Sequence, residues 1–156
     1  MKKILVLFLS LLALVFVACG KDKDIRDILD KEKISSEFNI VEENEKYFEF
    51  KDKDDNRDVF RIFMYEKISS VDFKNPKKID SLEEGYIEQG CDIIYKDKDT
   101  IMIGIFDPEV GYGYNIHNFD DSKTELAVIA SIGSDRELSE NELFEILKEA
   151  KSFIKK

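Results

Sequence analysis

Residues 91–132 have the sequence CDIIYKDKDTIMIGIFDPEVGYGYNIHNFDDSKTELAVIASI, in which four strand-like runs are separated by short polar turns. The last run covers residues 124–132. Its apolar residues Leu126, Val128 and Ala130 occupy alternate positions, as in a strand with one buried face. Turns this short join antiparallel strands, so the stretch predicts one antiparallel sheet. The other three runs extend from Cys91 to Tyr95, from Thr100 to Phe106 and from Gly111 to Phe119.

Three more strand-like runs lie upstream. The first two, residues 38–41 and 47–50, flank a polar turn and predict a hairpin. The third extends from Val59 to Tyr65, and its alternation predicts a strand. One face of this third strand holds large apolar residues, namely Phe60, Ile62 and Met64.

Two helices are predicted, one between the third and fourth strands and one at the C-terminal end of the sequence. The first begins at Asn75-Pro76 and ends at Gly90, because Asn and Pro are favoured at helix starts and Gly at helix ends. In the second, Ser139 and Glu142 have the spacing of a capping box. Each helix has one apolar face, formed by Ile79, Leu82 and Tyr86 in the first and by Leu143, Ile146, Leu147, Ala150 and Ile154 in the second.

The predicted order is three strands, a helix, four strands and a helix. Hairpin-linked strands with few helices are typical of an α+β domain, so we expect an antiparallel sheet of about six or seven strands covered by two helices. This order resembles that of the PsbP/Mog1-like domains, which include small bacterial lipoproteins. The resemblance covers residues 37–155, with Asn75-Pro76 and the C-terminal helix as its clearest marks.

The segment Met1–Cys19 has the parts of a secretory signal. A positive start is followed by an apolar run over residues 4–18 and then by a thiol after a small residue. The apolar run is shorter than the ~20 residues that a membrane-spanning helix needs, which favours a signal over a transmembrane anchor.

The end of this segment, Phe16-Val17-Ala18-Cys19, resembles the lipobox of bacterial lipoproteins, although Phe16 stands where that pattern prefers Leu. The resemblance implies cleavage before Cys19 and attachment of fatty chains such as palmitate to its thiol. Membrane lipid would then be the first partner of the protein, and its location would be the extracytoplasmic face of the cell membrane or the envelope. An ordinary cleaved signal and an uncleaved anchor are the alternatives.

Three parts of the chain follow from these patterns. Residues 1–18 are expected to form the signal peptide, residues 19–36 the lipidated N-terminus with a charged tether, and residues 37–156 a single α+β domain. The tether is interpreted as solvated because more than half of its residues are charged, although Ile25, Ile28 and Leu29 are spaced for one short helix.

The chain is strongly acidic. Its net charge is −10, and loss of Lys2 and Lys3 with the signal would make it −12. This charge excludes nucleic acid as a partner, because nucleic-acid binding depends on Lys and Arg that neutralise phosphates. It also disfavours a domain that lies on anionic lipid. A cationic partner is compatible with the charge, and so is plain solubility.

No catalytic or cofactor-binding pattern is present, and we expect neither an enzyme nor a bound cofactor. His117 is the only histidine, which excludes a His-rich metal site, and it is interpreted as a residue of the sheet rather than a general base. Cys91 is interpreted as a small apolar core residue, since its neighbours offer no cation that would activate the thiol.

Residues 52–56 invite comparison with a calcium-binding loop. Oxygen-bearing side chains occur there at alternate positions, but Arg57 and Phe63 stand where the EF-hand loop needs Gly and Glu. We therefore expect a hydrophilic turn and no metal site.

The stretch Asp107-Pro108-Glu109-Val110 is followed by two glycines that alternate with Tyr112 and Tyr114. Tyrosine rings with polar tips are suited to a binding edge, so these two residues are the candidate partner-binding edge. The alternative is a hairpin in which Gly allows the turn and Tyr packs on the sheet.

The function expected from the sequence is that of a non-enzymatic, membrane-anchored lipoprotein that acts as a binding module of the cell envelope. The alternative is an acidic inhibitor or immunity-type lipoprotein that masks a cationic envelope protein such as a lysozyme, with charge steering the association. An enzyme of an unrecognised type is a third hypothesis, in which His117 would be the residue to test.

Overall fold

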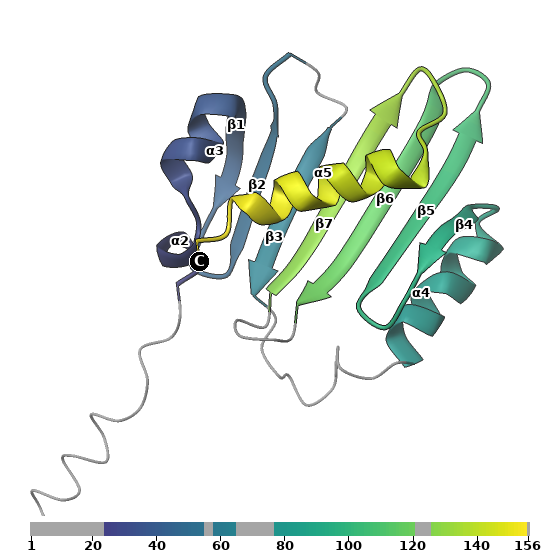
Figure 1. Ribbon diagram of the computed structural model, residues 1–156, viewed down its shortest axis with the longest axis horizontal. Helices are drawn as coiled ribbons and strands as arrows, with labels where there is room; N and C mark the ends of the chain where they lie inside the picture. Colours follow the sequence, from purple (N-terminus) through teal and green to yellow (C-terminus); the bar gives the residue numbers. More distant parts are fainter. Residues whose placement is uncertain (1–23, 55–57, 65–76, 121–125, 156) are drawn as a thin grey trace, which may run out of the picture.

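The computed structural model describes residues 24–54, 58–64, 77–120 and 126–155 (Figure 1). The predicted signal over residues 1–18, the lipid-attachment residue Cys19 and the predicted helix start at Asn75-Pro76 lie outside the described residues.

The described residues form a seven-stranded antiparallel sheet with the strand order β1-β2-β3-β7-β6-β5-β4. β7 lies in the middle and pairs with β3 on one side and β6 on the other. The α+β class and the antiparallel sheet are thereby confirmed. The strands are β1 (Phe38–Glu43), β2 (Tyr47–Asp52), β3 (Val59–Met64), β4 (Asp92–Lys96), β5 (Thr100–Asp107), β6 (Gly111–Asp120) and β7 (Leu126–Ser134).

Four helices lie in the described residues, so the expected covering by two helices is incomplete. They are α2 (Ile25–Ile28), α3 (Lys31–Glu37), α4 (Lys77–Glu88) and α5 (Glu140–Ser152). The predicted capping box at the start of α5 is confirmed, with the Glu142 carboxylate accepting from the Ser139 backbone N–H at 2.8 Å.

The main core lies between α5 and one face of the sheet. α5 crosses several central strands in Figure 1, and its Leu143, Leu147 and Ala150 are buried against them. At the β1–β2–β3 side the core is aromatic, because the phenylalanines of three strands meet Phe153, which caps α5. The ring contacts join Phe38, Phe48, Phe50, Phe60 and Phe153.

α4 covers part of the opposite face. Its Ile79 is buried in a second core cluster with Ile101 and Ile103 of β5, and Leu82 and Tyr86 pack against this cluster. The predicted end of the helix at Gly90 is confirmed, because Gly90 has φ +79° and follows the last turn. Alternate residues of β5, β6 and β7 therefore belong to two different cores.

Residues 24–37 belong to the domain. Ile25, Leu29 and Ile34 of this segment are fully buried in the main core. The backbone of this segment is bonded to the C-terminus, since Asp30 N–H donates to the Phe153 carbonyl at 2.8 Å and Lys155 N–H donates to the Ile28 carbonyl at 2.8 Å. The interpretation of residues 24–36 as a solvated tether is therefore wrong, and residues 19–23 lie outside the described residues.

The sheet has two ends, which differ in what they hold. At the end that we name the N-terminal end, α2 lies beside the β1–β2 turn, where Ile25 N–H donates to the Glu45 carbonyl at 2.8 Å. At the opposite end, which we name the hairpin end, the β5–β6 connection over residues 107–111 lies beside the end of β7, since Tyr112 pairs with Ser134. Figure 1 shows that the two ends are separated by the length of the strands.

Candidate functional site

The two tyrosines of the predicted binding edge lie on the α5 side of β6. Tyr114 is 5% exposed, and its hydroxyl accepts a hydrogen bond from Leu138 N–H at 2.7 Å in the connection that leads to α5. Tyr112 is half-buried between Tyr114 and Phe106, with ring centroids 6.5 Å and 4.7 Å apart. Tyr114 thus has a structural role, whereas the neighbouring rings of Tyr112 and Phe106 are more exposed.

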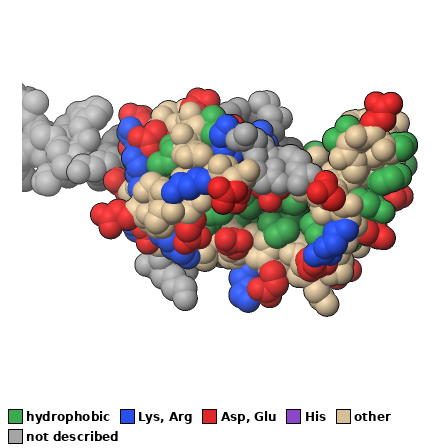
Figure 2. Space-filling view, turned by 90° about the horizontal axis from the view of Figure 1, so that it is seen from above, with side chains coloured by type: hydrophobic (Ala, Val, Ile, Leu, Met, Phe, Trp, Pro, Cys, Tyr) green, Lys and Arg blue, Asp and Glu red, His purple; other side chains and the backbone are tan. Residues whose placement is uncertain are grey.

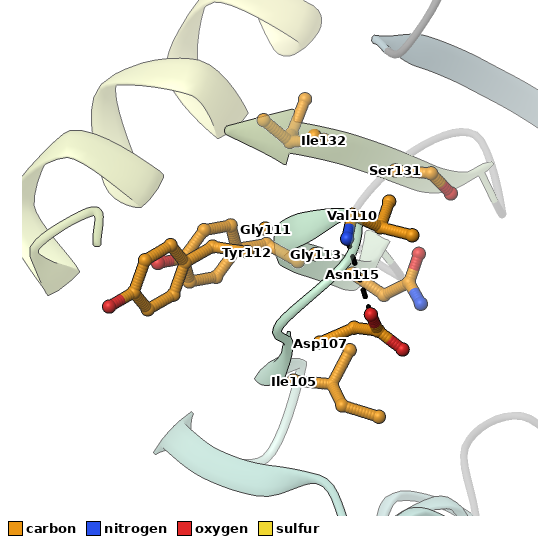
Figure 3. Close-up of a pocket in the computed structure, with 11 residues that line it drawn as sticks. Ile105, Asp107, Val110, Gly111, Tyr112, Gly113, Asn115, Ser131 and Ile132 are labelled. Carbon is orange, nitrogen blue, oxygen red and sulfur yellow. Dashed lines mark hydrogen bonds between the residues drawn. The ribbon is translucent and has the colours of Figure 1, made fainter. Parts of the chain in front are cut away.

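A pocket of about 400 Å³ opens at the hairpin end on the opposite face of the sheet (Figure 3). In Figure 3 the Tyr112 ring points away from Val110 and Asn115, on the other side of β6. The residues that line the pocket are Ile105, Asp107, Val110, Gly111, Tyr112, Gly113, Tyr114, Asn115, Ser131, Ile132 and Gly133.

The pocket exists because glycines leave the middle of the sheet without side chains. Gly113 of β6 pairs with Gly133 of β7 on one side and with Ile105 of β5 on the other. A Cβ atom on Gly113 would lie 3.3 Å from Cγ2 of Ile105, so the Ile105 side chain leans against this bare backbone. The Gly-Tyr alternation therefore builds two different surfaces, with rings towards α5 and a hollow on the other side.

Gly111 starts β6 in a conformation that other residues rarely adopt. Its φ is +97°, and a Cβ atom there would lie 2.8 Å from the backbone oxygen of Ser134. We expect Gly111→Ala to lower the free energy of unfolding by about 2–3 kcal/mol, because backbone strain and a clash with β7 add together. Gly90→Ala is the matched control, since Gly90 also has positive φ (+79°) but open space around it, and should cost about 1 kcal/mol. Urea unfolding of both variants measures the difference, and equal losses would show that the clash does not exist.

The rim of the pocket is unusually apolar for an exposed surface. Ile105 and Val110, which line the pocket, are 46% and 75% exposed. Phe106 is 58% exposed but pairs with Tyr112 and lies on the α5 side of the sheet. Figure 2 looks onto this end of the sheet and shows hydrophobic side chains between acidic ones. Ile105 and Val110 are not among the binding residues predicted from the sequence. The Asp107-Pro108 turn between them was the available signal, because side chains next to such a turn are often exposed.

The charged groups around the pocket are mainly acidic. Asp107 and Glu109 are exposed, and one carboxylate oxygen of Asp107 accepts from the backbone N–H groups of Glu109 at 2.7 Å and Val110 at 3.2 Å. These two bonds fix the turn and place the Asp107 charge at the pocket wall. Asp135 and Glu137 are also exposed, in the connection between β7 and α5.

Arg61 and Arg136 of the described residues are each paired with a carboxylate. The guanidinium of Arg136 contacts Glu142 and lowers the pKa of that carboxyl to about 2. Arg61 lies on the pocket face of the sheet, donates to Glu49 at 3.0 Å and reaches Ser131 Oγ at 3.3 Å. Arg61 is therefore matched by Glu49, and the exposed side chains of Asp107 and Glu109 on the hairpin are negative.

His117 does not line the pocket. It lies further along β6 under α4, is 8% exposed, and its Nε2 is 2.8 Å from the Tyr86 hydroxyl. Burial lowers the pKa of His117 to about 4 and raises the pKa of Tyr86. His117 is therefore neutral near pH 7, and its position is that of a sheet residue beneath a helix.

The buried His117 predicts an acid-sensitive stability. The unfolded chain binds a proton at the ordinary histidine pKa of about 6.5, and the folded chain only near pH 4. As the pH falls from about 7 to 5, the free energy of unfolding should fall by about 2 kcal/mol from this residue, with no effect of it above pH 7. Urea unfolding of the wild type and His117→Gln at both pH values measures this contribution. An equal loss in the two proteins would contradict the prediction.

Cys91 and the described residues 52–54 belong to no group of possible metal ligands. Cys91 is a half-buried free thiol. Asp52 accepts from Asp54 N–H at 2.7 Å, which is a turn contact, and residues 55–57 lie outside the described residues. Across the described ranges, no three His, Cys, Asp or Glu side chains are grouped to hold a metal ion.

None of the helices within the described ranges has the length and apolar character needed to cross a bilayer.

Comparison with known protein families, curated proteins and solved structures finds no match for this chain. The resemblances to bacterial lipoproteins and to PsbP/Mog1-like domains stay predictions from the sequence.

Proposed function

We propose that the protein is a non-enzymatic lipoprotein, anchored through acylated Cys19 on the extracytoplasmic side of the cell membrane or envelope, where it acts as a binding module. The observation that carries the proposal is the Met1–Cys19 sequence, with its positive start, apolar run and terminal thiol. The apolar rim of the pocket supports a binding role, because exposed apolar clusters with polar surroundings are typical of interaction sites.

The short segment between Cys19 and the domain would limit the distance between an anchored domain and the membrane. Cys19 and Asp24 are five residues apart, a distance of at most about 18 Å in an extended chain. Because α2 lies at the N-terminal end of the sheet, that end would be held close to the bilayer. The hairpin end with the pocket would then point away from the membrane, where a partner can reach it.

Intact-mass analysis of the membrane fraction tests the proposal. We expect a chain that begins at Cys19 and has the added mass of fatty acyl chains. Cys19→Ser should remove both the cleavage and the added mass, whereas the matched control Cys91→Ser should keep them. A wild-type chain that begins at Met1 and has no lipid mass would refute the anchoring.

A second candidate is the acidic inhibitor or immunity-type lipoprotein, which the acidic surroundings of the pocket favour. A chain of net charge −10 would attract a cationic envelope protein such as a lysozyme. Binding and inhibition of a purified cationic lysozyme should then weaken at least tenfold between about 50 and 300 mM salt. Inhibition that is independent of salt, or no inhibition, would exclude this candidate.

A further inference from the structure

The exposed apolar side chains of the domain are concentrated at one place. Five large hydrophobic residues are exposed in the described ranges, and three of them, Ile105, Phe106 and Val110, lie within six positions on the β5–β6 hairpin. Ile105 and Val110 line the pocket, whereas Phe106 lies on the other face of the hairpin beside Tyr112. The other two, Val41 and Ile87, are single residues on β1 and α4. A cluster next to a hollow differs from scattered exposure, which is normal on soluble proteins.

The hollow has a shape that suits one inserted side chain. Its floor is the bare backbone of the paired residues Gly113 and Gly133, and Ile105 and Val110 form apolar walls. Asn115 and Ser131, which pair directly on adjacent strands, supply polar groups at the inner side. An anchor residue held in a pocket with a polar border is the usual centre of a protein interface.

The surrounding charge selects among the possible occupants. A second copy of this chain would bring another net charge of −10 against Asp107 and Glu109, which disfavours self-association. A surface of anionic lipid is disfavoured for the same reason. A basic polypeptide is the occupant whose charge complements the rim.

We infer that this pocket is a docking site for a basic polypeptide, which inserts an aliphatic or aromatic side chain over Gly113 and Gly133 and places flanking Lys or Arg residues against Asp107 and Glu109. This assignment deepens the binding role proposed above and rests on it. The apolar residue supplies most of the affinity, and the flanking charges supply orientation and speed of association.

Fluorescence anisotropy with defined peptides tests the docking site on the full-length protein in zwitterionic nanodiscs, with empty nanodiscs as the blank. The probe is a labelled peptide Lys-Lys-Phe-Lys-Lys. Lys-Lys-Ser-Lys-Lys has the same charge without the anchor, and Glu-Glu-Phe-Glu-Glu has the anchor with the opposite charge. We expect the first peptide to bind at least tenfold more tightly than either of the others.

Substitutions on the rim locate the binding. Val110→Ser and Asp107→Asn should each weaken binding of Lys-Lys-Phe-Lys-Lys about three- to tenfold. Asn at position 107 can still accept the turn hydrogen bonds, so this variant removes only the charge. The matched controls are Ile87→Ser, an equally apolar exposed residue on α4, and Glu84→Gln on the same helix, and both should bind as the wild type does.

The outcomes are distinct. Equal affinity for the Phe and Ser peptides, undetectable binding of the Phe peptide, or unchanged affinity of Val110→Ser would overturn the docking site. Intact mass is measured on the same preparation, so failure of the anchor is recorded separately. A chain without lipid that still prefers Lys-Lys-Phe-Lys-Lys would refute the anchoring and keep the docking site.

Discussion

A chain that begins at residue 37 is expected not to fold, whereas a chain that begins at residue 20 should fold cooperatively. The shorter chain lacks Ile25, Leu29 and Ile34, which are fully buried against the C-terminal part of the core. Burial of three such side chains contributes about 5–9 kcal/mol, which is comparable to the whole stability of a domain of this size. Circular dichroism and thermal unfolding of the two purified chains measure the effect.

Point substitutions separate this cause from a general effect of shortening. Leu29→Ala in the longer chain should lower the free energy of unfolding by about 2–5 kcal/mol, because it leaves a cavity beside the C-terminal bridge to Ile154. Asp27→Ala, at an exposed position of α2, the helix that Leu29 caps, should change it by less than about 0.5 kcal/mol. If the two starting points gave equal melting temperatures, residues 24–36 would be a tether after all.

The sequence pattern predicted the strands well and the N-terminal segment badly, and the reason is the range of the contacts involved. Alternation in β7 or β3 is a local signal, because each strand has one face turned to the α5 core. In residues 24–36 the few apolar side chains stand among charged ones, and their burial depends on Phe153 and Ile154, more than a hundred positions away. The composition of residues 24–36 therefore indicated solvent exposure, whereas residues distant in the sequence bury their apolar side chains.

The residues predicted as a binding edge belong to the stretch that lines the pocket, but their rings lie on the other face of β6. Alternation alone places Tyr112 and Tyr114 on one side of β6 and Gly111 and Gly113 on the other. Which side is covered depends on the path of α5, whose connection bonds the Tyr114 hydroxyl through Leu138. Tyr112 and Tyr114 therefore lie on the side that α5 covers. Gly111 and Gly113, which have no side chains, leave space for the pocket on the other side.

The aromatic cluster at the β1–β2–β3 side connects the first three strands to the C-terminal end of α5. The Phe50 ring is stacked on Phe60 at 5.2 Å and meets Phe38 and Phe153 edge-on at 5.2 Å and 5.4 Å. These contacts link the first three strands to the residue that caps α5. Offset-stacked and edge-to-face pairs add about 0.5–1.5 kcal/mol each beyond the burial of their surface.

Phe50→Ala is therefore expected to lower the free energy of unfolding by about 4–5 kcal/mol, at the upper end of the range for a buried phenylalanine. Phe50 is fully buried, and its loss removes one partner from each of four neighbouring rings at once. Phe106→Ala is the matched control, since Phe106 is 58% exposed on the β5–β6 hairpin and should cost less than about 1 kcal/mol. Chemical denaturation of both variants, with unchanged slopes, measures the difference. Similar losses for Phe50→Ala and Phe106→Ala would mean that the aromatic cluster does not stabilise the contact between the first three strands and the end of α5.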